Sequence, residues 1–137
     1  MNENEVKVFT LEEANELLSL LSELVVKLQE KRDQIAEVEV QIDTHELVSG
    51  RPANSPDPEF EKWMAKHRGL VDQFYEVVDE IHSYGCFLKD VDLGLIDFYG
   101  VIEERIVCLC WRFGEEKVCF WHEVQDGYAG RKPLDEK

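Results

Sequence analysis

Three cysteines and a histidine in the C-terminal half are the residues whose types suit a metal ion. Cys108 and Cys110 form a C-x-C pair, and Cys119 and His122 follow further along the chain. Three thiolates and one imidazole can hold zinc, but zinc loops favour a C-x2-4-C spacing, whereas alternate residues of a strand lie about 6–7 Å apart. The spacing therefore favours reduced thiols packed as small hydrophobic residues, and we predict no cofactor. The alternatives are a zinc site of these four residues and a Cys110–Cys119 disulfide.

The run from Asp90 to Asp97, DVDLGLID, carries carboxylates that could bind a cation. Its alternating acids and glycine are similar to part of a calcium loop, but a hairpin turn explains the glycine without an ion. A three-residue turn would place Asp97 opposite Lys89, which predicts a cross-strand salt bridge. Asp90 would then lie on an apolar face, where a carboxylate needs an arginine partner. The candidate partners are Arg105, Arg112 and Arg131.

His122 and the glycine-rich tail could take part in acid–base chemistry or anion binding. His122 could be a general base or a ligand, or a hydrogen-bonded residue at a strand end. Two glycines in segment 127–131 expose backbone N–H groups beside Arg131, an arrangement that suits an anion. A tight turn with Arg131 paired to Asp90 or Glu115 is the alternative. The candidate ligand pocket consists of Asp90, Asp97, Glu115, His122 and Arg131.

A long amphipathic helix opens the chain. Thr10 and Glu13 form the two ends of a capping box, in which each side chain bonds to the other residue's backbone amide. Apolar residues then recur in steps of three and four to about Val48, except where Arg32 and Glu39 intervene. Gly50 is suited to the left-handed residue that ends a helix. These signals predict one continuous helix from the capping box to Gly50.

A second amphipathic helix follows, beginning at Ser55-Pro56 or at Asp57-Pro58 and ending at Tyr84-Gly85. The facing apolar stripes predict an antiparallel, coiled-coil-like hairpin over residues 10–84. By length, the first helix should outrun the second from Ile35 to Val48. We therefore predict a homodimer formed through the protruding end of the first helix, whose apolar residues include Ile35, Val38 and Ile42.

The apolar period changes to that of strands after Gly85. Strands are predicted over Cys86–Val91, Leu95–Tyr99, Glu104–Phe113 and Lys117–Glu123, and a turn-rich tail follows them. Short consecutive strands favour an antiparallel meander. We predict a single α+β domain over residues 1–137, with the helical hairpin packed on a four-stranded meander and its tail over residues 85–134.

The turn between the last two strands decides which side chains share a face. A two-residue turn at Gly114-Glu115 would place Cys110 opposite Cys119 and Cys108 opposite Trp121, with His122 on the other face. A turn longer by one residue would reverse this arrangement, because successive strand residues point to opposite faces.

Composition excludes some partners. The chain has 30 Asp and Glu against 15 Lys and Arg, for a formal charge of −15. Such a surface repels nucleic acids and anionic membranes, so neither is expected as a partner. The N-terminal residues show no basic and apolar export signal, and we expect a cytoplasmic protein with reduced cysteines.

The ordered motifs of the chain resemble one small bacterial family. FTLEEAN (9–15) is followed by GLIDF (94–98), LCWRFGE (109–115), WHE (121–123) and GYAGRKPL (127–134). Together they are similar to the domain of unknown function 2203, although Tyr99 stands where a proline is common in that family. The resemblance implies no activity. It implies that the polar residues inside the motifs are the ones to test, namely Lys89, Asp90, Asp97, Cys110, Glu115, His122 and Arg131.

Two function classes follow from these observations. The first is a non-enzymatic binding or assembly module, for which neither a protein partner nor a small ligand can be named. The second is a metal- or anion-dependent enzyme whose site gathers the five residues of the candidate ligand pocket. No nucleophile elbow, phosphate-binding loop or dinucleotide fingerprint occurs in the sequence, so we expect the first class.

Overall fold

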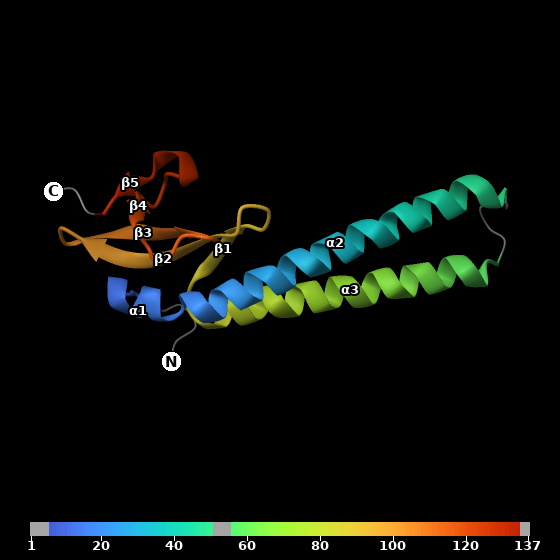
Figure 1. The fold of residues 1–137 in the computed structure, drawn as a ribbon, viewed down its shortest axis with the longest axis horizontal. Coiled ribbons are helices and arrows are strands. Elements are labelled where there is room, and N and C mark those ends of the chain that lie inside the picture. Colours follow the sequence, from blue (N-terminus) through green and yellow to red (C-terminus); the bar gives the residue numbers. More distant parts are fainter. Residues whose placement is uncertain (1–5, 51–55, 135–137) are drawn as a thin grey trace.

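A computed structural model describes residues 6–50 and 56–134 of the chain. Three helices are followed by an antiparallel sheet in the order β1-β2-β3-β4-β5 (Figure 1). The α+β class is confirmed, with five strands instead of four, because the tail pairs with β4 and adds a short edge strand. The elements are α1 (Leu11–Glu16), α2 (Leu18–Ser49), α3 (Pro58–Ser83), β1 (Phe87–Asp90), β2 (Leu95–Ile102), β3 (Arg105–Arg112), β4 (Phe120–His122), the 3-10 helix η1 (Tyr128–Gly130) and β5 (Lys132–Pro133).

The predicted capping box is present, with Glu13 N–H donating to Thr10 Oγ1 at 3.1 Å and Thr10 N–H donating to Glu13 Oε1 at 2.9 Å. The prediction of one continuous helix was wrong, because the chain bends at Leu17 between α1 and α2. The bend leaves α1 beside the sheet, where Asn15 Oδ1 accepts a hydrogen bond from Val118 N–H at 2.7 Å, while α2 extends away (Figure 1). The hydrogen bond from Val118 to Asn15 thus holds α1 at the sheet, although the apolar spacing of the sequence continues across Leu17.

The remaining helix ends follow the sequence signals. Gly50 has φ of 65° and ends α2 in the left-handed conformation. Asp57 caps α3 by accepting a hydrogen bond from Phe60 N–H at 3.2 Å. Of the two predicted starts of this helix, the structure has the one at Asp57-Pro58. Ser55, which belongs to the other predicted start, lies outside the described residues. Gly85, with φ of 95°, follows the end of α3.

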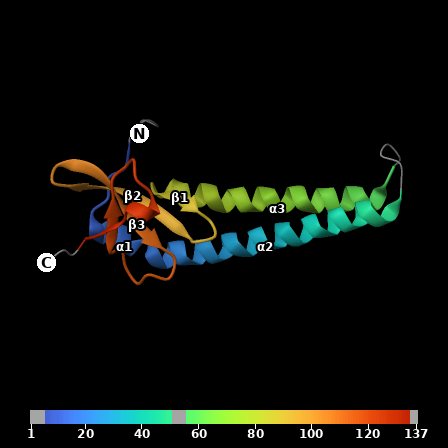
Figure 2. The ribbon, with the colours of Figure 1, turned by 90° about the horizontal axis from the view of Figure 1, so that it is seen from above.

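Helices α2 and α3 run side by side to the far end of the hairpin in both views (Figures 1 and 2). Lys31 contacts Gln73 at 2.7 Å, and His45 contacts Asp57 at 2.8 Å close to the far end. The predicted overhang of Ile35–Val48 beyond the second helix was therefore wrong. Because the two helices are joined at the far end, the extra length of α2 lies at the sheet end, where Leu18 and Leu21 are buried.

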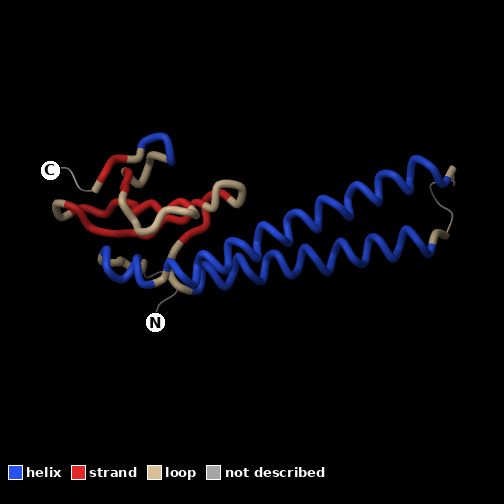
Figure 3. The backbone as a smooth tube through the Cα atoms, viewed as in Figure 1, coloured by secondary structure: helices blue, strands red, loops and turns tan. Residues whose placement is uncertain are grey.

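The core lies where the sheet meets the near ends of the helices. Ile96 and Phe98 of β2, together with Leu109 and Trp111 of β3, pack on this face. Their neighbours from the helices include Leu21, Val25, Leu28 and Ile81. Most of the hairpin extends beyond this core as a two-helix arm (Figure 3). No helix in the described part of the chain combines the length and apolar character that a membrane span requires.

The pairing of β3 with β4 differs from the prediction by one residue. Cys108 pairs with His122 and Cys110 with Phe120, so Cys110 does not face Cys119. The strands are joined by a connection much longer than a two-residue turn, from residue 113 to 119. Strand parity then moves His122 to the face that carries Cys108 and Cys110. All four cysteines are free thiols.

Candidate metal centre

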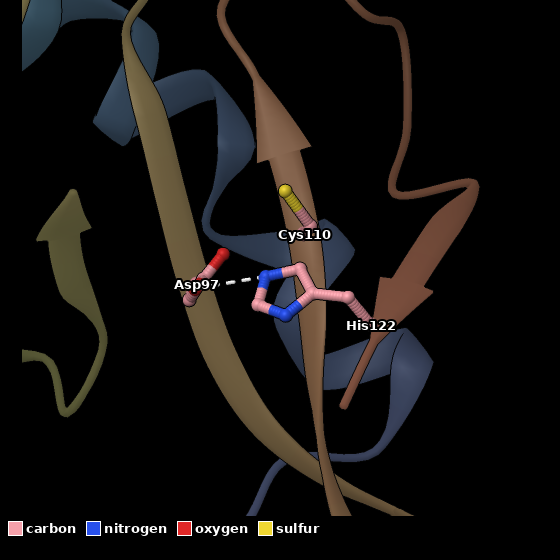
Figure 4. Close-up of side chains that lie close together, drawn as sticks. All are labelled: Asp97, Cys110 and His122. Atoms are coloured by element: carbon pink, nitrogen blue, oxygen red, sulfur yellow. Dashed lines mark hydrogen bonds and ion pairs between the residues drawn. The ribbon is translucent and has the colours of Figure 1, made fainter. Parts of the chain in front are cut away.

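Asp97, Cys110 and His122 form a buried cluster on the sheet face that points away from the helices. Each comes from a different strand: Asp97 from β2, Cys110 from β3 and His122 from β4 (Figure 4). One oxygen, one sulfur and one nitrogen of the three side chains lie within 4.8 Å of one another. Asp97 is 3% exposed, Cys110 1% and His122 2%. Such mutually close donor atoms can surround a single metal ion.

The strand register brings these residues together. Asp97 pairs directly with Cys110 across β2 and β3. His122 pairs with Cys108, which puts it on the same face as Cys110 because residues two apart on a strand share a face. Strand β3 therefore lies between the strands of Asp97 and His122, and the Cys110 thiol lies beside the contact between these two residues (Figure 4).

Both ring nitrogens of His122 are engaged. Nδ1 lies 2.8 Å from the carbonyl oxygen of Glu123, which can only accept, so Nδ1 carries a proton and donates it. Nε2 lies 3.1 Å from Oδ2 of Asp97. A neutral imidazole with a proton on Nδ1 directs a lone pair from Nε2, and here that lone pair faces a carboxylate oxygen. A proton or a metal cation must therefore lie between the two atoms.

The bond from Nδ1 to a backbone carbonyl is also the arrangement that holds a metal-binding histidine. Such a bond fixes the tautomer and leaves Nε2 free to bind the ion. His122 is thus oriented by Glu123 and presents Nε2 to the cluster.

The surroundings of the site raise the pKa of two thiols, those of Cys108 and Cys110. Burial, followed by the negative charge of Asp97, raises the pKa of Cys110 to about 12. The same two causes raise the pKa of Cys108 to about 11. A bound cation reverses this effect, because a coordinating thiol loses its proton to the metal.

A cavity of about 290 Å³ adjoins the three residues. Lys89 and Asp90 from the end of β1 border it, as do Asp126 and Tyr128 of the tail. A ligand of modest size could therefore approach the cluster directly. The described lining consists of Lys89, Asp90, Leu95, Asp97, Cys110, His122, Asp126, Gly127 and Tyr128.

Asp90 has a different role from the one expected. Its Oδ1 accepts a hydrogen bond from Leu93 N–H at 2.9 Å, which stabilises the β1–β2 turn, and no described arginine pairs with it. The predicted Lys89–Asp97 salt bridge was also wrong. A bulge between Leu88 and Asp90 shifts the register, so that Asp97 pairs with Phe87.

Glu115 and Arg131 pair with each other beside the cluster. Arg131 Nη2 donates to Glu115 Oε2 at 2.6 Å, and the guanidinium lies 4.0 Å from the ring centroid of Phe120. Glu115 also accepts from Arg112 N–H at 2.8 Å. Of the two partners expected for Arg131, the structure confirms Glu115. Neither residue is among those that line the described cavity, so this pair anchors the tail to the sheet.

The cluster combines residues that the sequence placed in two separate groups. The sequence predicted Asp97 and His122 as residues of a ligand pocket. It gave Cys110 and His122 as candidates for a metal site. Cys108 and Cys119 are not part of the three-residue group. Asp126 and Tyr128 of the cavity wall were missed, because only the fold of the tail brings them to the sheet.

An antiparallel sheet with a helical hairpin on one face and a buried Asp–Cys–His cluster on the other defines an α+β protein able to hold a metal ion. The chain belongs to the family of uncharacterized conserved proteins DUF2203, whose family model matches residues 7–134. The resemblance seen in the sequence motifs is thereby confirmed. Comparison with curated proteins and with solved structures gave no match.

Proposed function

We propose that this protein binds one divalent transition-metal ion, of which zinc fits best, through Asp97, Cys110 and His122. The observation that carries the proposal is the Nε2–Oδ2 contact between His122 and Asp97, with Nδ1 already donating to Glu123. The lone pairs of His122 Nε2 and Asp97 Oδ2 face each other, and a metal ion between these atoms would be coordinated by both. All three side chains are buried, and they border a cavity from which a ligand can reach them.

The donor set selects the metal. Thiolate and imidazole suit zinc, whereas magnesium and calcium prefer oxygen ligands. A dication bound by one carboxylate and one thiolate has no net charge, which makes the centre compatible with burial. The tetrahedral preference of zinc requires a fourth ligand.

The fourth position faces the cavity in this proposal. Three protein ligands and one open position are typical of catalytic zinc, which polarises a bound group or lowers the pKa of bound water. Of the two function classes left open by the sequence, the centre supports the metal-dependent one. The substrate would be a small molecule that fits beside Lys89 and Tyr128. A cytoplasmic location is part of the proposal, supported by four free thiols.

Titration of the metal-free protein with zinc against a competing chelator tests the proposal. We expect one ion per chain and a loss of affinity of more than about 100-fold in Asp97→Asn. The asparagine amide can donate to Nε2 of His122, so this variant should keep its fold while losing the ligand. Cys119→Ser is the matched thiol control and should bind zinc normally. Zinc binding that survives Asp97→Asn would refute the proposal.

A further inference from the structure

The arm formed by the far parts of α2 and α3 has few fully buried side chains, and most apolar residues of its α3 part are half-buried. Beyond Leu28, Val38 is the one described side chain of α2 that is buried, and in α3 the buried side chains are Val77 and Ile81, near the sheet. Helices in water derive most of their stability from the burial of an apolar face. An arm with so few buried residues is therefore suited to a partner that covers it.

One flank of the arm carries two hollows that share residues of their lining. Trp63 and Lys66 border two hollows, of about 390 Å³ and 340 Å³. The first hollow is also lined by Val38 and Val40 of α2, and Val40 is 61% exposed. Trp63 is half-buried and borders both hollows, and the Lys66 ammonium lies 5.7 Å from its ring centroid. Tryptophan is enriched among the residues that contribute most of the binding energy in protein interfaces.

The charges around Trp63 are balanced, in contrast to the whole chain with its net charge of −15. Glu37 borders the first hollow and Glu59 the second, while Lys62 borders the second and Lys66 both. In a two-fold dimer each residue of a contact occurs twice, so a patch with both signs can be complementary to itself. The net charge of −15 of the whole chain disfavours a nucleic acid or an anionic membrane as the partner.

We infer that the Trp63 flank, defined by Glu37, Val40, Glu59, Lys62, Trp63 and Lys66, is the interface between two copies of this chain. The two arms pack side by side as a four-helix bundle, with the half-buried Trp63 of each copy at the centre of the contact. Glu37 of each copy then faces Lys66 of its partner. This places the homodimer on the side of the arm, because the expected protruding end of the first helix does not exist.

Sedimentation of the full chain tests the interface. We expect a dimer whose dissociation constant increases by at least about 30-fold in Trp63→Ala, the loss expected for a central interface residue. Circular dichroism should show that the helices persist in the variant. A concentration of about 100 μM is well above the dissociation constant of a specific dimer. A wild-type chain that stays monomeric at this concentration would overturn the inference. So would a Trp63→Ala dimer of unchanged strength.

A charge exchange gives a sharper test of the geometry. Glu37→Lys and Lys66→Glu should each weaken the homodimer, because each places like charges opposite one another twice. An equimolar mixture of the two variants restores both pairs and should form a heterodimer. Glu76→Lys, an exposed change on α3 away from Trp63, is the control and should dimerise as wild type does. A mixture that does not associate would overturn the Glu37–Lys66 arrangement.

Discussion

Nε2 of His122 lies 3.1 Å from Oδ2 of Asp97, although the proton of the ring is directed to Glu123. The contact is buried and has the Cys110 thiol beside it. A buried polar contact of this kind is stable only when a proton or a cation joins the two acceptors. The function proposed for this protein rests on that relationship.

Alanine substitutions at two glycines should change the stability of the protein in opposite directions. Gly94 has φ of +66°, and an added Cβ would lie 2.5 Å from Cβ of Phe113, so Gly94→Ala should destabilise the protein by about 2–4 kcal/mol. Gly69 lies within α3 with no atom within 4 Å of an added Cβ. Gly69→Ala should therefore stabilise by about 0.5–1 kcal/mol. Urea denaturation measures both, and effects of the same sign would contradict the turn geometry.

The anchoring role of Glu115 predicts a specific loss of stability. In Glu115→Ala the Arg131 guanidinium, whose side chain is 9% exposed, loses its carboxylate partner. We expect a decrease in unfolding free energy of about 2–4 kcal/mol, because a buried charge is left uncompensated. The neighbouring Glu116 is exposed, and Glu116→Ala should change the unfolding free energy by less than about 0.5 kcal/mol. Equal effects of the two substitutions would show that the pair does not hold the tail.

Thiol reactivity should separate Cys119 from the others. Burial raises the pKa of Cys86 to about 11, and Cys108 and Cys110 are raised for the reasons given above. Cys119 is half-buried, so an alkylating reagent at neutral pH should modify it first. Mass spectrometry of the peptides identifies the order. Early modification of Cys110 would contradict the buried site.

In the metal-free protein, the same thiols predict a dependence of stability on alkaline pH. Their pKa is higher in the folded chain than the ordinary value of 9.0, so the unfolded chain loses these protons first. The stabilisation is complete below about pH 9 and is lost as pH rises toward 11 and beyond. Cys86→Ala, remote from the metal centre in the helix–sheet core, should flatten part of this decline. Unfolding free energies measured across the range provide the check.

Much of the fold could be predicted from local chemistry. The capping box at Thr10, the left-handed Gly50 and the Asp57 cap each depend on a few adjacent residues, and the structure has all three. The bend at Leu17 could not be predicted, because it depends on contacts of α1 with a loop about a hundred residues away. The fifth strand likewise depends on how the tail returns to β4.

The site was harder to predict because it depends on register. Asp97, Cys110 and His122 were each recognised as candidates, but the expected pairing put His122 and Cys110 on opposite faces. The length of the β3–β4 connection and the bulge beside Lys89 each change which residues meet, and neither follows from the alternation of apolar residues. The spacing argument against zinc considered ligands on one strand, whereas the cluster draws one ligand from each of three strands.

The absorption spectrum of the cobalt-substituted protein tests the metal centre most directly. Cobalt(II) takes up the sites that zinc occupies and reports both tetrahedral geometry and a sulfur ligand. We expect intense visible bands with a near-ultraviolet sulfur-to-metal band, and loss of the latter in Cys110→Ser but not in Cys119→Ser. A spectrum without the sulfur band in the wild-type protein, or one that is unchanged in Cys110→Ser, would contradict coordination by Asp97, Cys110 and His122.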